Sequence, residues 1–312
     1  MDDPNGEKTF FALEGNCPVV VVAPHAGRND ITPSGARAFG KRENDPSTAR
    51  TPNVSNDVRT LEIAFALVRT LSAMGFVPYA FLNCVSRGYM DLNRPWGGQE
   101  MWRDANGVYR PGDELKSPAE FPRVRSFAAF KRDYYDRMHA EIQAVTTDLH
   151  PNGWIFDVHG RQVDGADLEL FTGYGHYARR DFIYDNGAAS LHAHLVEQGW
   201  AVRPGSPDPG DEVGATTSPA TNLISGGRYG ASHFSPTRDP IPRPDNVIPT
   251  APHRLHGVQF EISRRLRPSG PPETLENVGI GLAHAMFGFL RDNGVITRVP
   301  RPLTGHNTNL WM

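Results

Sequence analysis

The chain has 312 residues, a formal net charge of −3 and 21% charged residues. This length suits a single α/β domain, which we expect to span 1–312. The sequence has no basic surplus and no apolar run of about 20 residues, so it predicts neither a nucleic-acid partner nor a membrane span. Because the acidic, polar N-terminus lacks an apolar signal core, we expect a cytoplasmic protein.

The first predicted strand is 18–23 (PVVVVA), whose continuous β-branched character is typical of a strand buried on both faces. The following stretch, 28–56, is polar and rich in Gly, Pro, Ser and Asn, so we expect a long functional loop. Apolar residues at helical spacing predict a helix over 57–74 that ends at Gly75, and 76–85 is the next predicted strand. This strand–helix–strand order favours a parallel sheet.

The rest of the chain continues to alternate between helical and strand patterns. The predicted elements are helices over 124–149, 188–198 and 271–293, strands over 153–158 and 257–262, and loops over 100–122 and 216–245. We therefore expect one α/β domain in which the long loops 28–56 and 216–245 border the functional site.

Several polar residues lie at or just beyond the carboxyl ends of predicted strands, where ligands gather in open α/β sheets. These residues are His25, Arg87, Asn93, Arg94, His159 and Glu261. Neutral imidazole is a common zinc ligand, and a catalytic zinc site needs about three protein ligands. Asp157 lies two residues before His159, on the same side of the strand, where it can orient the imidazole ring.

A carboxylate is expected as the third ligand, and two candidates remain open. Asp30 is close to His25 in the sequence, whereas Asp57 opens the first long helix, where it could equally be a helix cap. Glu261 alternates with apolar residues in its strand, which fits either a general base beside a metal or an ion pair with Arg264 or Arg265.

The segment 87–94 (RGYMDLNR) carries two arginines and an asparagine. A planar guanidinium binds a carboxylate through two parallel hydrogen bonds, and a nearby amide adds a donor. One arginine could therefore hold a substrate carboxylate while the other polarises a carbonyl. A surface Asp–Arg pair is the alternative interpretation.

Other catalytic motifs are missing from the sequence. It contains no Walker-type or dinucleotide-binding glycine loop, no nucleophile-elbow serine and no His-Glu-x-x-His helix. The two cysteines, Cys17 and Cys84, form no Cys-x-x-Cys pair, and we expect both to be buried, reduced thiols. Water activated by a metal is therefore the main hydrolytic option.

Six segments in order resemble the N-formylglutamate amidohydrolase family, which is related to zinc carboxypeptidases, aspartoacylases and poly-γ-glutamate hydrolases. They are Pro24-His25-Ala26-Gly27, Asp91-Leu92-Asn93-Arg94, 135–139, Asp157-Val158-His159-Gly160, 222–230 (NLISGGRYG) and Val258-Gln259-Phe260-Glu261. The resemblance implies a three-layer α/β/α sandwich around a mixed, mainly parallel sheet. It also implies hydrolysis of an N-acyl amino acid, with one zinc ion (Zn2+) per chain held by two histidines and an acid.

The resemblance also assigns roles to individual residues. His25 and His159 match the zinc ligands, and Glu261 matches the catalytic glutamate. Arg87 matches the arginine that polarises the scissile carbonyl, while Asn93 and Arg94 match the pair that binds the substrate carboxylate.

The acidic ligand departs from the carboxypeptidase pattern, because Arg28 stands where those relatives have glutamate. The segment 57–64 (DVRTLEIA) resembles the corresponding part of the γ-glutamate hydrolases, and on this basis Asp57 is preferred to Asp30. Arg228, after a Gly-Gly pair, is a candidate for binding a second carboxylate. A surface arginine is the alternative.

Two positions differ from the family pattern close to the expected metal. Ala26 and Gly160 each stand where the family has serine, so two hydroxyl groups are lost. The substrate is thus expected among small N-acyl amino acids or short peptides with a free carboxylate. A carboxypeptidase or γ-glutamyl hydrolase using the same site is one alternative, and a carboxylate-binding protein without activity is another. The sequence leaves the oligomeric state open.

Overall fold

The computed structural model describes residues 1–2, 5–39, 41–42, 55–93, 102–103, 109–110, 129–149, 152–161, 166–171, 187–203, 255–269 and 272–296. The predicted loop 216–245 lies outside these residues, as do Arg94 and Arg228. Residues 43–54 lie outside them too, so the predicted loop 28–56 is described only in part.

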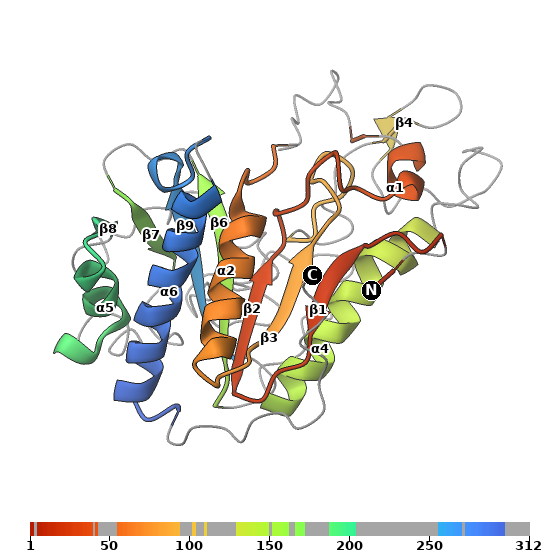
Figure 1. The fold of residues 1–312 in the computed structure, drawn as a ribbon. Helices are drawn as coiled ribbons and strands as arrows, with labels where there is room; N and C mark the ends of the chain where they lie inside the picture. The colour runs from red at the N-terminus through yellow and green to blue at the C-terminus, as the bar shows by residue number, and fades with distance from the viewer. Residues whose placement is uncertain are drawn as a thin grey trace, which may run out of the picture.

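A seven-stranded mixed sheet forms the centre of the fold, with the order β1-β3-β2-β6-β9-β7-β8. Its strands are β1 (Phe10–Leu13), β2 (Val19–Ala23), β3 (Tyr79–Asn83), β6 (Trp154–Arg161), β7 (Leu168–Phe171), β8 (Val202–Arg203) and β9 (His256–Ser263). The central strands β3, β2, β6 and β9 are parallel, so their carboxyl ends meet at one edge (Figure 1). Strand β1 is antiparallel to β3, and β7 is antiparallel to β9 but parallel to β8.

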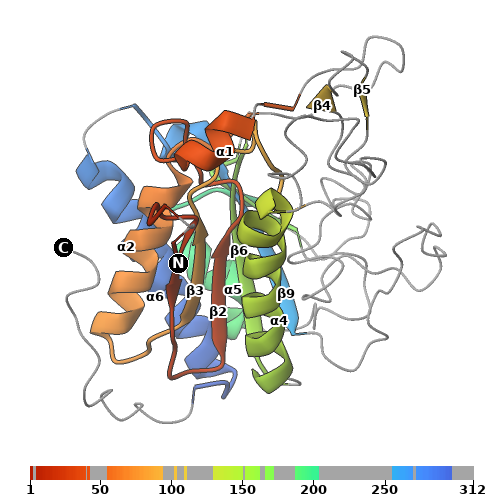
Figure 2. The ribbon, with the colours of Figure 1, turned by 90° about the vertical axis from the view of Figure 1, so that its right-hand side faces the viewer.

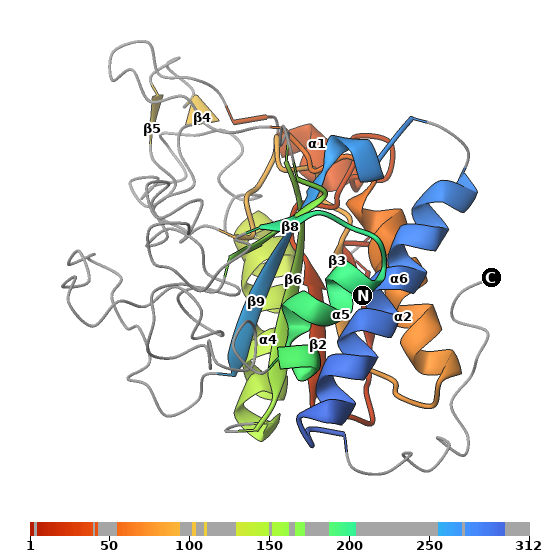
Figure 3. The same cartoon turned by 90° about the vertical axis from the view of Figure 1, so that its left-hand side faces the viewer.

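Helices cover both faces of this sheet, as the two edge-on views show (Figures 2 and 3). They are α1 (Ser34–Phe39), α2 (Thr60–Ala73), α4 (Arg137–Leu149), α5 (Leu191–Glu197) and α6 (Pro272–Asp292). Helices α2, α5 and α6 lie on one face and α4 lies on the other, which confirms the predicted three-layer α/β/α class. A separate two-stranded hairpin is made by β4 (Trp102–Arg103) and β5 (Tyr109–Arg110).

The side-chain alternation of β2 explains why the strand is apolar throughout. Val19 and Val21 belong to the apolar core with α2 and α6, whereas Val20 and Val22 pack in a second core with α4. Every residue of the strand is buried, as expected for a central parallel strand covered on both faces. His25 follows this rigid strand directly.

Several predicted boundaries are corrected by the structure. Helix α2 begins at Thr60 rather than at residue 57, because Arg59 has a left-handed backbone with φ of 73°. Strand β3 begins only at Tyr79, after Pro78, whose nitrogen has no proton to donate to a sheet. The predicted loop 28–56 contains the short helix α1, which the Gly- and Ser-rich composition concealed.

Other elements were shifted or missed. The helix predicted over 124–149 is described from residue 129 and opens with a π-helical turn at Lys131–Asp136 before α4. Strands β1, β7 and β8 were missed because they have four residues or fewer, too few for a clear periodicity.

Both cysteines are free thiols and buried, as predicted. Burial raises the pKa of Cys17 and of Cys84 to about 12, so both remain protonated at neutral pH. In the part of the chain that the structure describes, no helix is both long and apolar enough to cross a bilayer.

Candidate metal centre

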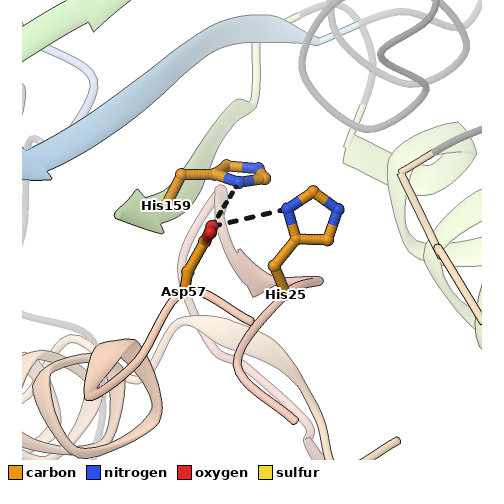
Figure 4. Close-up of side chains that lie close together, drawn as sticks. All are labelled: His25, Asp57 and His159. Atoms are coloured by element: carbon orange, nitrogen blue, oxygen red, sulfur yellow. Dashed lines mark hydrogen bonds and ion pairs between the residues drawn. The ribbon is translucent and has the colours of Figure 1, made fainter. Parts of the chain in front are cut away.

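Three side chains from distant parts of the chain converge at the carboxyl edge of the sheet (Figure 4). His25 follows β2, His159 lies near the end of β6, and Asp57 precedes α2. Oδ2 of Asp57 lies 2.9 Å from Nδ1 of His159 and 3.4 Å from Nδ1 of His25. The donor atoms all lie within 4.8 Å of one another, and all three residues are buried.

The far nitrogen of each imidazole faces another buried carboxylate. Nε2 of His25 is hydrogen-bonded to Oδ1 of Asp91 at 2.7 Å. Nε2 of His159 lies 3.0 Å from Oδ1 of Asp157. Both rings therefore turn Nδ1 toward Asp57 and Nε2 toward a supporting carboxylate, which is how metal-binding histidines are commonly oriented.

The backbone fixes Asp57 beside His25. The Asp57 N–H donates to the carbonyl of His25 at 3.1 Å, and the Thr60 hydroxyl donates to the Asp57 carbonyl at 2.6 Å. Arg59, not Asp57, is the N-cap of α2, and it makes no side-chain cap hydrogen bond. The Asp57 carboxylate is thus directed to the two histidines instead of capping the helix.

Gly27 lies in the turn that follows β2 and His25. A Cβ at residue 27 would collide with the backbone of Val85 and Cys84. The absence of a side chain therefore lets the turn after β2 pack against the end of β3. In that turn, Nδ2 of Asn83 donates to the carbonyls of Pro24 and Val85 at 2.6 and 2.7 Å.

The cluster favours positive charge at its centre. Burial alone would raise the pKa of the Asp57 carboxyl, but its interactions with His159 and His25 hold that pKa well below its ordinary value. Burial lowers the pKa of His159, but Asp157 and Asp57 outweigh it and raise that pKa well above 6.5. The imidazoles thus lie where a cation is stabilised.

The residues present fit a divalent metal ion. When Nε2 of His25 donates its proton to Asp91, Nδ1 turns a lone pair toward Oδ2 of Asp57, and two acceptors face each other. A metal ion bound between them would accept both lone pairs. Asp57, Asp91 and Asp157 are 8%, 1% and 0% exposed, and Arg87 pairs with Asp91. Two imidazole nitrogens and a carboxylate oxygen are also a frequent zinc donor set.

Glu261 lies next to this cluster because of the strand register. It is the direct partner of His159 across β6 and β9, so both side chains project from the same sheet face. Glu169 is its partner on the other side, across β9 and β7. Nε2 of Gln259 donates to Oε1 of Glu261 at 2.6 Å. Glu261 is partly exposed, whereas Glu169 is buried.

Arg87 and Asn93 also reach the cluster, but as partners of its members. Nε of Arg87 donates to Oδ2 of Asp91 at 2.7 Å, and both residues are buried. The side-chain nitrogen of Asn93 lies 3.1 Å from Nε2 of His159, and Asn93 is 0% exposed. The carbonyl-polarising role expected for Arg87 and the substrate-binding role expected for Asn93 stay predictions.

Asp30 and His139 do not belong to the group of three clustered side chains. Asp30 is exposed and paired with Arg28, with Nη2 and Oδ2 2.8 Å apart. His139 is buried on α4 against the ring of Tyr135, with ring centroids 4.3 Å apart. Of the two acids that the sequence left open, Asp57 is the one that lies beside the histidines.

The sequence patterns did not reveal Asp91 or Arg267 as parts of this site. Asp91 is in the segment 87–94, in which the two arginines and the asparagine were the predicted functional residues. Arg267 follows β9, outside every predicted element, and approaches the site only through the tertiary fold.

No protein-family model matches the sequence, and no curated protein matches it. A solved gene product of Agrobacterium tumefaciens is similar in fold, with 16% identity, a TM-score of 0.46 and coverage of 92% of this chain and 93% of that one. The N-acetylmuramoyl-L-alanine amidase of Clostridium difficile 630 has 8% identity, a TM-score of 0.32 and coverage of 88% and 97%. Zinc-free YndL has 14% identity, a TM-score of 0.37 and coverage of 93% and 94%. Values this low assign no family, so the functional inference rests on this chain's own residues.

Proposed function

We propose that this protein is a zinc-dependent hydrolase of amide bonds. The observation that carries the proposal is the convergence of Nδ1 of His25, Oδ2 of Asp57 and Nδ1 of His159 within 4.8 Å, with a carboxylate behind each imidazole. In the proposed site these three residues hold one zinc ion. When bound, zinc acts as a Lewis acid that makes a water molecule a nucleophile near neutral pH.

Glu261 is the proposed general base. It projects from the same sheet face as His159, and the Gln259 amide donates a hydrogen bond to one of its carboxylate oxygens. Glu261 takes a proton from the attacking water. It then delivers that proton to the amine as the carbon–nitrogen bond breaks, so the products are a carboxylic acid and an amine.

The proposed substrate is a small N-acyl amino acid with a free carboxylate, resembling N-formylglutamate. This part of the proposal rests on the segments that resemble the N-formylglutamate amidohydrolases, with Asn93 and Arg94 as the expected partners of the substrate carboxylate and Arg228 as the candidate for a second one. An arginine binds a carboxylate through two hydrogen bonds and can thereby place the amide over the metal.

The first experiment measures zinc by elemental analysis in the purified, zinc-loaded wild type and in three variants. We expect about one zinc per chain in the wild type, and its loss in His159→Ala and Asp57→Ala, because catalytic zinc needs about three protein ligands. Asp30→Ala is the matched control, since Asp30 is an exposed acid near His25 in sequence. A wild type without metal after loading would refute the proposal.

The second experiment tests hydrolysis. Zinc-loaded protein is supplied with N-formyl, N-acetyl and N-succinyl amino acids and with γ-glutamyl and C-terminal peptides, and the released amine is measured. Glu261→Gln is expected to keep its zinc and to lose about 100-fold or more of the activity, as for loss of a general base. If only peptides are hydrolysed, the substrate is a peptide and not an N-acyl amino acid. Zinc binding without any turnover would favour the alternative that the protein binds carboxylates without activity.

A further inference from the structure

Arg267 lies in a position that links the three functional segments. Its Nε donates to the carbonyl of Ile262 at 3.0 Å, and its Nη1 donates to the carbonyl of Val58 at 2.5 Å. The guanidinium also lies against the backbone of Gly160. Gly160 follows His159, Val58 follows Asp57, and Ile262 follows Glu261. The side chain of Arg267 therefore contacts the residue that comes directly after each of these three proposed site residues.

Gly160 is what makes room for this guanidinium. A Cβ at residue 160 would lie 2.6 Å from Nε and 2.7 Å from Nη1 of Arg267, and its three nearest atoms all belong to that side chain. Any other residue at 160 would therefore force the guanidinium to shift from this position. Gly160 is thus coupled to an arginine more than a hundred residues away in the sequence.

Arg267 and the His159 side chain lie on opposite faces of the sheet. Successive side chains of a strand point to opposite faces, so a Cβ on Gly160 would point to the face opposite to that of His159. Arg267 therefore lies behind the histidine and not over its ring. From this face of the sheet, Arg267 donates a hydrogen bond to the carbonyl of Val58. Val58 follows Asp57, which lies on a loop and not on a strand.

We propose that Arg267, seated on Gly160, is a positioning residue that holds the Asp57 segment in the geometry needed for the metal. This inference rests on the proposed function, because it concerns the metal ligands of the same site. The guanidinium fixes the Val58 peptide to the end of β9 and places a positive charge near the carboxylates of Asp57 and Glu261. A ligand held in place before the metal arrives has less conformational entropy to lose on binding.

The test measures zinc affinity by competition with a chromogenic chelator, using the full chain. The variants are Arg267→Gln, Arg267→Lys, Gly160→Ser and the double variant Gly160→Ser/Arg267→Gln. Arg264→Gln is the matched control, because Arg264 is an exposed arginine in the same turn after β9. Cobalt-substituted protein gives a second readout, since its visible absorption reports the coordination geometry.

We expect Arg267→Gln and Gly160→Ser each to weaken zinc binding by about 10- to 100-fold, the range for residues that orient metal ligands. The double variant should bind no more weakly than either single variant, since both remove the same contact. Arg267→Lys should recover part of the loss, and Arg264→Gln should match the wild type. The cobalt spectra of Arg267→Gln and Gly160→Ser should change in the same way.

Unchanged affinity and an unchanged cobalt spectrum in folded Arg267→Gln would overturn the inference while leaving the proposed metal site intact. Additive losses in the double variant would overturn the coupling to Gly160. If Arg267→Gln does not fold, Gly160→Ser, which keeps the arginine, decides by the same readouts. Absence of zinc in the wild type would instead refute the proposed function itself.

Discussion

At the scale of single residues, the site is defined by carboxylates that support histidines. Asp91 accepts hydrogen bonds from Nε2 of His25, from Nε of Arg87 and from the N–H of Asn93. It is 1% exposed, so these contacts fix both the orientation and the tautomer of His25. In the proposed site, Asp91 would therefore act on a bound metal through His25.

The substitution Asp91→Asn should weaken zinc binding by about 10- to 100-fold, as for other residues that orient metal-binding histidines. The amide keeps the size of the side chain but removes the charge that favours Nε2–H on His25. Zinc affinity is measured by chelator competition, with Asp30→Asn as the exposed control. Equal affinities in Asp91→Asn and the wild type would show that Asp91 does not support the ligand.

At the scale of elements, the contact between α2 and α6 holds the loop that carries Asp57. Gly279 of α6 lies against α2 so closely that a Cβ would be 2.6 Å from the Ile63 carbonyl oxygen and 2.9 Å from the Leu67 nitrogen. These are backbone atoms, which cannot turn aside as a side chain can. The two helices therefore pack at this distance only because residue 279 is glycine.

The substitution Gly279→Ala should lower the free energy of unfolding by about 1–3 kcal/mol, the usual cost of overpacking a core. Alanine has a higher helix propensity than glycine. A lower free energy of unfolding in Gly279→Ala would therefore come from the contact between α2 and α6 and not from helix propensity. Chemical denaturation measures the effect, and Asn277→Ala at an exposed position of α6 is the control. Equal or higher stability in Gly279→Ala would show that the helices can move apart freely.

At the scale of the whole molecule, a metal at the candidate centre would join three segments that are distant in sequence. His25 follows β2, Asp57 precedes α2 and His159 belongs to β6, and the three meet only in the folded protein (Figure 1). An ion that binds the folded chain and not the unfolded chain stabilises the fold by mass action.

We expect zinc at about 1,000 times its dissociation constant to stabilise the chelator-treated protein by about 4 kcal/mol and to raise its Tm by about 5–15 °C. The comparison is a thermal melt with and without zinc, and His159→Ala should show almost no rise. A rise of the same size in His159→Ala would place the stabilising ion elsewhere.

Strong local patterns allowed the sequence to predict the sheet core and the long helices. The β-branched run of β2 and the apolar spacing of α2 and α6 each reflect burial of a whole face, so their periodicity is clear. Strands β1, β7 and β8 are short edge or near-edge elements, and only pairing with neighbouring strands defines them.

The sequence by itself determined that His25, His159 and Glu261 belong to one edge of the sheet, because each lies at or just beyond the end of a strand. It left the choice between Asp30 and Asp57 to a resemblance. Only the tertiary structure decided which of these acids lies beside the histidines. It also showed that Asp91 is hydrogen-bonded to His25 and that the guanidinium of Arg267 lies against Gly160. The physical reason is that strand ends follow from local periodicity, whereas contacts between residues far apart depend on how loops return to the sheet.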